Sequence, residues 1–221
     1  MAWSDTGDFT SGQILTAAAM DKVREAMFFG QATFTNEAAR DTAFANPGAL
    51  APITLQEGMR SYLTASTVAA ATGTTTAVPS GITTVYNGSA WVCTTPVGST
   101  SLTSASTTST SYVTTLTGDA TAISVTLATG TTALVHMTGQ ASNNTVASTN
   151  YLAISVSGAT TLAAGNASYF GQSTASYSLG FSRVFILTGL TAGTNTFTLN
   201  YLTTGGTLTY QARNLVVQGI A

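Results

Sequence analysis

The sequence predicts a mainly β protein whose C-terminal part is an antiparallel jelly roll or β-sandwich, and two observations support this fold class. Large apolar side chains alternate with small or polar ones at 151–157 and again at 196–201. Side chains alternate across a strand, so each pattern buries one face and exposes the other to water. Turn-forming residues at 191–195 and 203–206 separate such segments, and short strands at close spacing are typical of sandwiches.

The strongest local signal is a hairpin over residues 83–92. Its Asn87-Gly88 pair predicts a two-residue turn, because both central positions of such a turn need positive φ. This register pairs Thr84 with Trp91 and places Tyr86 diagonally from Trp91 on one face, a stabilising arrangement. Further strands are expected at 59–63, 112–116, 123–127, 133–137, 207–210 and 215–217.

Two short helices are expected near the start of the chain. Thr16 can cap a helix that runs to Met27 and ends before Gly30. Its apolar stripe is only about three turns long, which is too short for stability in isolation, so we expect it to dock on a partner. Asn36 can cap a second helical turn over 37–41.

Composition divides the chain into four parts. Residues 65–80, rich in Thr and Ala, are expected to form a loop or linker within the second part. The four expected parts are 1–30, an anchor with a short helix; 31–95, a small α+β attachment module with the hairpin; 96–111, a Thr/Ser-rich linker; and 112–221, the jelly-roll head.

Charge is scarce and unevenly distributed. Charged residues make up 6% of the 221-residue chain, and its net charge is −2, against roughly 25% charged residues in ordinary soluble domains. After Ser61 the only charged residues are Asp119, Arg183 and Arg213. This balance predicts neither nucleic-acid binding nor membrane insertion. A long, nearly uncharged β region favours a permanent assembly that covers part of its surface, although a Thr and Ser shell selected for endurance is an alternative.

Candidate catalytic groups are few, so we expect no enzyme activity and no cofactor or metal. His136, the only histidine, lies on a predicted strand without triad or metal partners. Cys93 has no histidine nearby, and Asp119 has no second carboxylate in the β region with which to hydrolyse a glycoside. The N-terminus lacks the order of a secretion signal, which predicts synthesis in a cytoplasm without export by the usual route.

One stretch, 166–177, combines aromatic rings with Asn, Gln and Ser in the manner of binding loops. The alternative is another strand pair whose aromatic rings fill the sandwich or a trimer axis. The residues expected to contact a host, through a surface polysaccharide, are Tyr169, Phe170, Gln172 and Tyr177.

Several motifs resemble virion proteins of tailed bacteriophages. The opening at 9–18, an arginine-aspartate helix at 39–43, a glycine-methionine and tyrosine-leucine strand at 57–63, and a tyrosine-asparagine-glycine and tryptophan hairpin at 85–92 are similar to a module near the attachment end of such proteins. The segments 190–199 and 213–217 resemble the trimeric jelly-roll heads of phage fibres, which belong to the broad tumour-necrosis-factor and complement-like fold group.

The resemblance implies a structural protein of the virion, made in the host cytoplasm, that projects as a homotrimer from the tail tip or fibre. The short linker suits a compact appendage. Capsid decoration or a head fibre is the alternative location, and a bacterial carbohydrate-binding or adhesive module is an alternative of another class. Other virion proteins are expected to hold the N-terminal region through Trp3, Phe9, Met20, Val23 and Met27.

Overall fold

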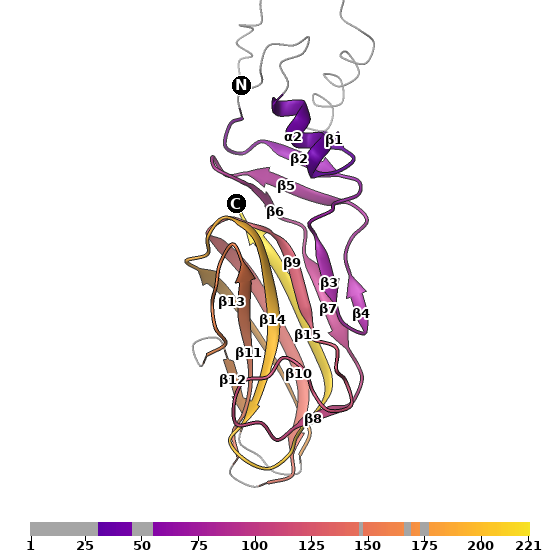
Figure 1. Ribbon diagram of the computed structural model, residues 1–221, viewed down its shortest axis with the longest axis vertical. Coiled ribbons are helices and arrows are strands. Elements are labelled where there is room, and N and C mark those ends of the chain that lie inside the picture. The colour runs from indigo at the N-terminus through magenta and orange to yellow at the C-terminus, as the bar shows by residue number, and fades with distance from the viewer. Residues whose placement is uncertain (1–30, 46–54, 146–147, 166–168, 173–176) are drawn as a thin grey trace, which may run out of the picture.

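The computed structural model describes residues 31–45, 55–145, 148–165, 169–172 and 177–221. Figure 1 shows an elongated molecule in which a small module, with one helix and a four-stranded sheet, stands at one end of a long sandwich. The expected mainly β, antiparallel fold is confirmed. The module consists of β1 (Ala32–Phe34), α2 (Glu37–Ala45), β2 (Arg60–Leu63), β5 (Ile82–Tyr86) and β6 (Trp91–Cys93).

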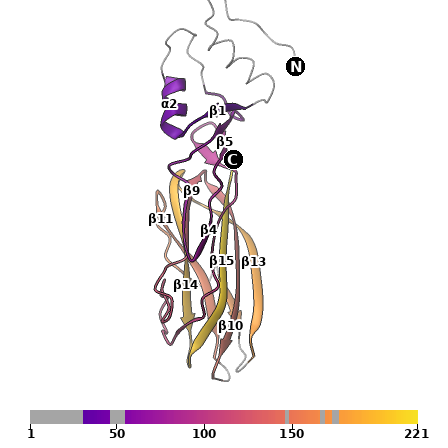
Figure 2. The same ribbon diagram turned by 90° about the vertical axis from the view of Figure 1, so that its right-hand side faces the viewer.

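Two sheets face each other in the sandwich, and Figure 2 shows them nearly edge-on. One, which we call the β10 sheet, has the order β13-β10-β15-β7-β4, with β8 also paired to β15; the other, the β14 sheet, has the order β12-β11-β14-β9-β3. The strands are β3 (Ala70–Thr72), β4 (Thr75–Ala77), β7 (Val97–Ser101), β8 (Ala105–Thr107), β9 (Ser124–Thr129), β10 (Thr132–Asn143), β11 (Asn150–Gly158), β12 (Tyr169–Gln172), β13 (Leu179–Thr188), β14 (Gly193–Thr203) and β15 (Leu208–Ile220).

Eight of these strands have the connectivity of a jelly roll. Along the chain, β7, β10, β13 and β15 fall in the β10 sheet, and β9, β11, β12 and β14 fall in the β14 sheet. The last strand, β15, lies between β7 and β10, and β14 lies between β9 and β11. Such interleaving of early and late strands produces two Greek keys, which define the jelly roll.

The alternation in the sequence explains why these strands form and which way they face. Leu152, Ile154 and Val156 on β11 are buried, as are Phe197 and Leu199 on β14. These side chains meet those of the β10 sheet in one continuous core, which removes apolar surface from water. The predicted strands at 207–210 and 215–217 are in fact one strand, the 13-residue β15.

The prediction of a linker at 96–111 is wrong for much of this segment. The segment contains β7 and β8, and both strands pair with β15. Small hydroxyl side chains fill this part of the core. The hydroxyl of Ser99 donates to the carbonyl of Thr72 at 2.5 Å. The head therefore begins at β7, before residue 112.

Two other predicted segments also differ from the structure. Residues 65–80 contain β3 and β4, which extend the β14 and β10 sheets respectively. Both strands are three residues long, and such short strands protect a sheet edge from further pairing. Residues 112–116 are not a strand; only isolated bridges join Val113 to Tyr201 and Leu116 to Asp119.

Buried asparagines secure the turns at the two ends of the sandwich. Asn195 is fully buried; its amide nitrogen donates to the Thr129 hydroxyl at 2.7 Å and to the Thr191 carbonyl at 3.0 Å. Its carbonyl oxygen accepts from the backbone N–H of Thr160 at 2.8 Å. Asn143 has a similar role elsewhere, donating to the side chain of Asn150 at 2.7 Å and to Gly205.

Replacement of Asn195 by alanine is expected to reduce the free energy of unfolding by about 2 kcal/mol, because buried partners lose their hydrogen bonds. Urea denaturation followed by circular dichroism measures this loss. Asn144→Ala is the control, since Asn144 is exposed. Equal stability of the two variants would contradict a stabilising role for Asn195.

Candidate functional site

The module carries the three segments that resemble the phage proteins, and the structure brings them together. The arginine-aspartate segment lies on α2, the 57–63 segment includes β2, and the 85–92 segment includes the β5–β6 hairpin. Helix α2 begins as predicted, because the side-chain oxygen of Asn36 accepts from the backbone N–H of Ala39 at 2.9 Å. The sheet has the order β1-β2-β5-β6, with β1 parallel to β2.

Arg40 joins the helix to the sheet. Its guanidinium carbon lies 4.6 Å from the centroid of the Trp91 ring, in the arrangement of a cation–π contact. One guanidinium nitrogen, Nη1, donates to the Thr84 hydroxyl at 3.3 Å, and Nε donates to Asp41 at 2.8 Å. The Thr84 hydroxyl also lies 2.6 Å from that of Ser61 on β2. Arg40 thus contacts the hairpin segment directly, and Thr84 connects it to Ser61 in the 57–63 segment.

Aromatic rings continue this contact across the module. The centroids of Phe34 and Phe44 are 5.7 Å apart, those of Phe44 and Trp91 are 5.6 Å apart, and those of Trp91 and Tyr86 are 5.5 Å apart. All three pairs are tilted, which aromatic quadrupoles prefer to direct stacking. This row packs helix α2 onto β1 and the hairpin.

Glu37 anchors the start of the same helix. Its carboxylate accepts from the Ser66 hydroxyl and from the backbone N–H and the hydroxyl of Thr67. Burial alone would raise the pKa of the Glu37 carboxyl, but these hydrogen bonds outweigh it and lower the pKa below its ordinary value. Glu37 therefore stays ionised and holds the 66–67 segment against the helix.

The β5–β6 hairpin is present, but its predicted register is wrong. Tyr86 pairs directly with Trp91, and Thr84 pairs with Cys93. The turn is centred on Gly88 and Ser89, because the backbone N–H of Asn87 donates to the carbonyl of Ala90. Gly88 has φ of 90°, and glycine is favoured as the first central residue of a type II′ turn. The side chain of Asn87 accepts hydrogen bonds within the turn, which explains its position before the glycine.

The module packs closely on the end of the jelly roll. A Cβ atom on Gly219 would lie only 2.6 Å from the side chain of Val92 and 2.7 Å from the Cys93 carbonyl. Glycine is therefore required where β15 passes the hairpin. Gln218 on β15 donates to the carbonyl of Thr94 at 2.7 Å. Burial raises the pKa of the Cys93 thiol to about 11, as expected for a structural cysteine.

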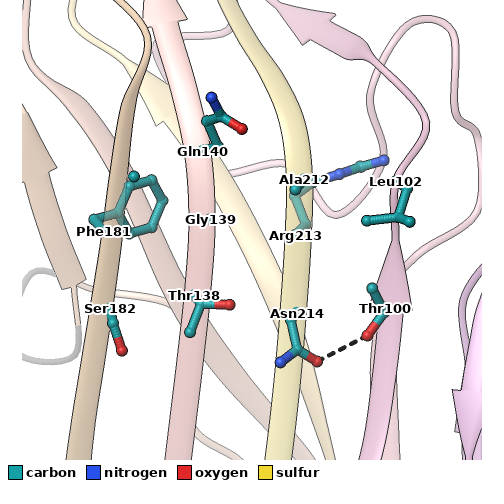
Figure 3. Close-up of a pocket in the computed structure, with 11 residues that line it drawn as sticks. Thr100, Leu102, Thr138, Gly139, Gln140, Phe181, Ser182, Ala212, Arg213 and Asn214 are labelled. Atoms are coloured by element: carbon teal, nitrogen blue, oxygen red, sulfur yellow. Dashed lines mark hydrogen bonds between the residues drawn. The ribbon is translucent and has the colours of Figure 1, made fainter.

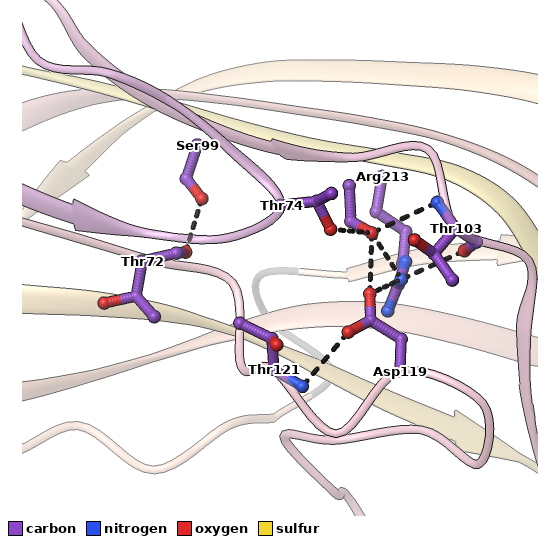
Figure 4. Close-up of polar contacts among 8 residues, drawn as sticks. Thr72, Thr74, Ser99, Thr103, Asp119, Thr121 and Arg213 are labelled. Atoms are coloured by element: carbon purple, nitrogen blue, oxygen red, sulfur yellow. Dashed lines mark hydrogen bonds and ion pairs between the residues drawn. The ribbon is translucent and has the colours of Figure 1, made fainter.

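The most buried charged pair lies in the jelly roll and joins Arg213 to Asp119 (Figure 4). The two side chains are 0% and 7% exposed, and Nη2 of Arg213 lies 2.5 Å from the Asp119 carboxylate. Nη2 also donates to Ser101 at 2.9 Å and to the carbonyl of Thr103 at 3.2 Å. The pair fastens the 102–122 connection to β7 and β15.

The charge of Asp119 is maintained by its contacts. Burial would raise the pKa of this carboxyl, but hydrogen bonds from Ser101 and Thr121, together with the adjacent Arg213, lower the pKa below its ordinary value. Nε and Nη1 of Arg213, by contrast, have no hydrogen-bond partner among the described residues. The guanidinium instead lies 5.6 Å from the centroid of Tyr201. Burial raises the pKa of Tyr201 to about 12, so the phenol stays neutral.

The residues expected at the host contact are only partly described. Tyr169, Phe170 and Gln172 belong to β12, which pairs with β11 at one edge of the β14 sheet. Tyr177 lies outside the strands, and 73% of its side chain is exposed. The attachment residues Trp3, Phe9, Met20, Val23 and Met27 lie outside the described residues, and so does the helix expected at 16–27.

Metal ligands, the histidine and membrane-spanning helices can be examined in the described part of the chain. There, no three His, Cys, Asp or Glu side chains lie close enough together to hold a metal ion. His136 lies on β10, as predicted, and its Nε2 is 2.8 Å from the hydroxyl of Ser182 on β13. Within the same residues, no helix has the length and apolarity to cross a membrane.

Comparisons with known proteins give only distant likenesses. No family model and no curated protein matches the sequence. Among solved structures, an infectious bursal disease virus structure has a TM-score of 0.35 and 9% identity, covering 63% of this chain and 41% of that one. The Clostridium thermocellum xylanase CBM22-1–GH10 modules have a TM-score of 0.31 and 11% identity, covering 53% and 26%.

A tailspike domain of bacteriophage CBA120 has a TM-score of 0.23 and 12% identity, covering 54% of this chain and 19% of that chain. The chain thus spans less than half the length of these structures. Structural similarity this weak does not indicate a function for this chain.

Proposed function

We propose that the protein is a structural, non-enzymatic appendage protein of a tailed-phage particle. Its module attaches to other virion proteins, and its jelly roll projects as a homotrimer from the tail tip or fibre. The observation that supports this most is the assembly of the three phage-like segments into one unit, joined by Arg40 and Trp91 at one end of the molecule.

The distribution of charge supports the same two roles, attachment for the module and a structural role for the jelly roll. The described part of the module carries three exposed charged residues, Asp41, Glu57 and Arg60, and exposed charges of this kind suit attachment to other proteins. In the jelly roll the one carboxylate is that of Asp119, which pairs with Arg213 in the interior. Glycoside hydrolysis commonly needs two carboxyl groups, and the jelly roll has one acidic side chain. This supports a structural rather than an enzymatic head.

The location on the particle can be tested directly. Antibodies raised against the jelly roll and labelled with gold should bind purified particles at the tail in electron micrographs. Label distributed over the capsid would contradict a tail location and favour decoration of the shell. Label on the bacterial surface, without particles, would contradict a virion protein and favour the adhesive module of a bacterium.

For a protein at the tail, we propose that the region around Tyr177 contacts a neutral host polysaccharide. An aromatic ring can stack on a sugar face without any charge, and Tyr177 is well exposed. Tyr177→Ala should slow adsorption of particles to host cells and lower the melting temperature by no more than a few degrees. Tyr62→Ala, in the module, serves as the matched control. Adsorption at the normal rate would contradict a host contact at Tyr177.

A further inference from the structure

The outer face of the β10 sheet carries a row of exposed apolar side chains. Val184 and Ile186 on β13 are 57% and 60% exposed. Val184 pairs with His136 on β10, and His136 in turn pairs with Val216 on β15. Ile186 pairs with Leu134 on β10. Directly paired residues share a face of the sheet, so four aliphatic side chains lie on one face, with His136 between Val184 and Val216 and with Gln218 opposite Leu134 on β15. We call the set of Leu134, Val184, Ile186 and Val216 the apolar row.

This face also carries no charged residue in the part of the chain that the structure describes. Arg183 and Arg213 pair with Met137 and Gly139 on the other side of β10, toward the sandwich interior. The outer face of the β14 sheet is different in kind, since it is covered by hydrogen-bonded hydroxyl and amide groups. Pairs of this type there are Thr126 with Thr196, at 2.8 Å, and Ser155 with Asn200, at 2.8 Å.

Figure 3 shows the residues that line a hollow of about 550 Å³. Its lining residues Thr138, Ser182 and Asn214 follow the row residues along β10, β13 and β15. Its lining includes Gly180 on β13 and Ala212 on β15, the two strands that flank β10. Leu102, which is 72% exposed, stands at its border. The same face therefore has both projecting apolar side chains and a hollow whose one charged lining residue, Arg213, has a fully buried side chain. These two shapes suit a heterologous contact between identical subunits.

We infer that copies of this chain contact one another through the outer face of the β10 sheet. Burial of an unpaired charge in a contact between copies is unfavourable, and the described part of this face carries no charge, so the face can be buried without that cost. Among the described strands, the 10-residue β13 is the outermost of its sheet and borders this face, and burial of an outermost strand prevents indiscriminate pairing. This inference rests on the proposed homotrimer and specifies its surface.

Light scattering on the full chain tests the surface. At pH 8 the wild type should have about three times the chain mass, and Ile186→Asp should have the mass of one chain with its far-UV circular dichroism retained. Val184→Ser is the milder second variant, expected to raise the dissociation constant at least tenfold. Ser157→Asp places the same charge on the exposed outer face of the β14 sheet and should leave the trimer intact.

The outcomes distinguish an error in the proposed contact surface from an error in the proposed homotrimer. A trimer that survives both Ile186→Asp and Val184→Ser would overturn the surface but leave the homotrimer standing. A monomeric wild type would overturn both, and loss of Ile186→Asp from particles would then indicate another virion protein as the occupant.

Discussion

Replacement of Asp119 by alanine is expected to lower the free energy of unfolding by about 3–5 kcal/mol, because it leaves the Arg213 charge buried without its carboxylate. The side chain of Arg213 is fully buried, and its Nη2 has few other acceptors, namely Ser101 and the Thr103 carbonyl. Chemical denaturation at pH 7 measures the loss. Arg60→Gln, which removes an exposed charge from the module, should change stability by about 0.5 kcal/mol or less.

A double replacement separates the pair from the packing around it. Removal of both charges, in Asp119→Leu with Arg213→Met, should cost less than the sum of the single replacements, since no isolated charge then remains buried. Additive losses would show that the two charges do not stabilise each other.

The same pair predicts how stability changes in acid. Because the pKa of Asp119 is lowered in the folded protein, its contribution is present above the ordinary aspartate pKa of about 3.9. This contribution is lost as pH falls from there through the lowered pKa of the folded protein, because below it the carboxyl is protonated in both the folded and the unfolded state. The difference in stability between the wild type and Asp119→Asn should therefore shrink below about pH 4.

The second large effect is expected at Trp91. Its replacement by alanine removes the ring that contacts Arg40, Phe44 and Tyr86, and loss of a large aromatic side chain from a packed site costs about 3–5 kcal/mol. The upper part of that range applies to full burial, and Trp91 is half-buried. We therefore expect a loss of about 3 kcal/mol, together with failure of the protein to enter particles.

Two measurements check this expectation on the same variant. Proteolysis should cut the module of Trp91→Ala sooner than that of the wild type, and blotting of purified particles should show its absence. Trp91→Phe keeps an aromatic ring against Arg40 and should restore much of both properties. Normal incorporation of an unstable Trp91→Ala module would place attachment elsewhere on the chain.

The jelly roll was predictable where large and polar side chains alternate. Leu152, Ile154, Phe197 and Leu199 are buried as expected. Strand β7 was not predicted, because its buried positions after Val97 hold Gly and Ser and therefore lack apolar contrast with the one partly exposed position. The hydroxyls of Ser99 and Ser101 become buried only through partners distant in sequence, the Thr72 carbonyl and the side chains of Asp119 and Arg213.

The candidate site was predictable as a set of segments but not as a geometry. The resemblance grouped the Arg40 helix with the Trp91 hairpin, and the cation–π contact between them depends on the fold. The hairpin register failed because both Asn87-Gly88 and Gly88-Ser89 are acceptable turns, and the bonds within the turn decide between them. The scarcity of charge could have indicated one contact. If Asp119, the one acidic side chain of the head, is buried, its only possible cationic partners there are Arg183 and Arg213.

The central claim, that this chain is a component of a phage particle, is tested most directly by quantitative mass spectrometry of purified virions. Particles should be separated by density gradient and washed in high salt, and peptides of this chain should be counted against those of the major capsid protein. The structural role predicts a fixed ratio between the two proteins across the particle peak and after washing. Recovery of the chain only in the soluble fraction of lysed cells, with none in the particle peak, would contradict it.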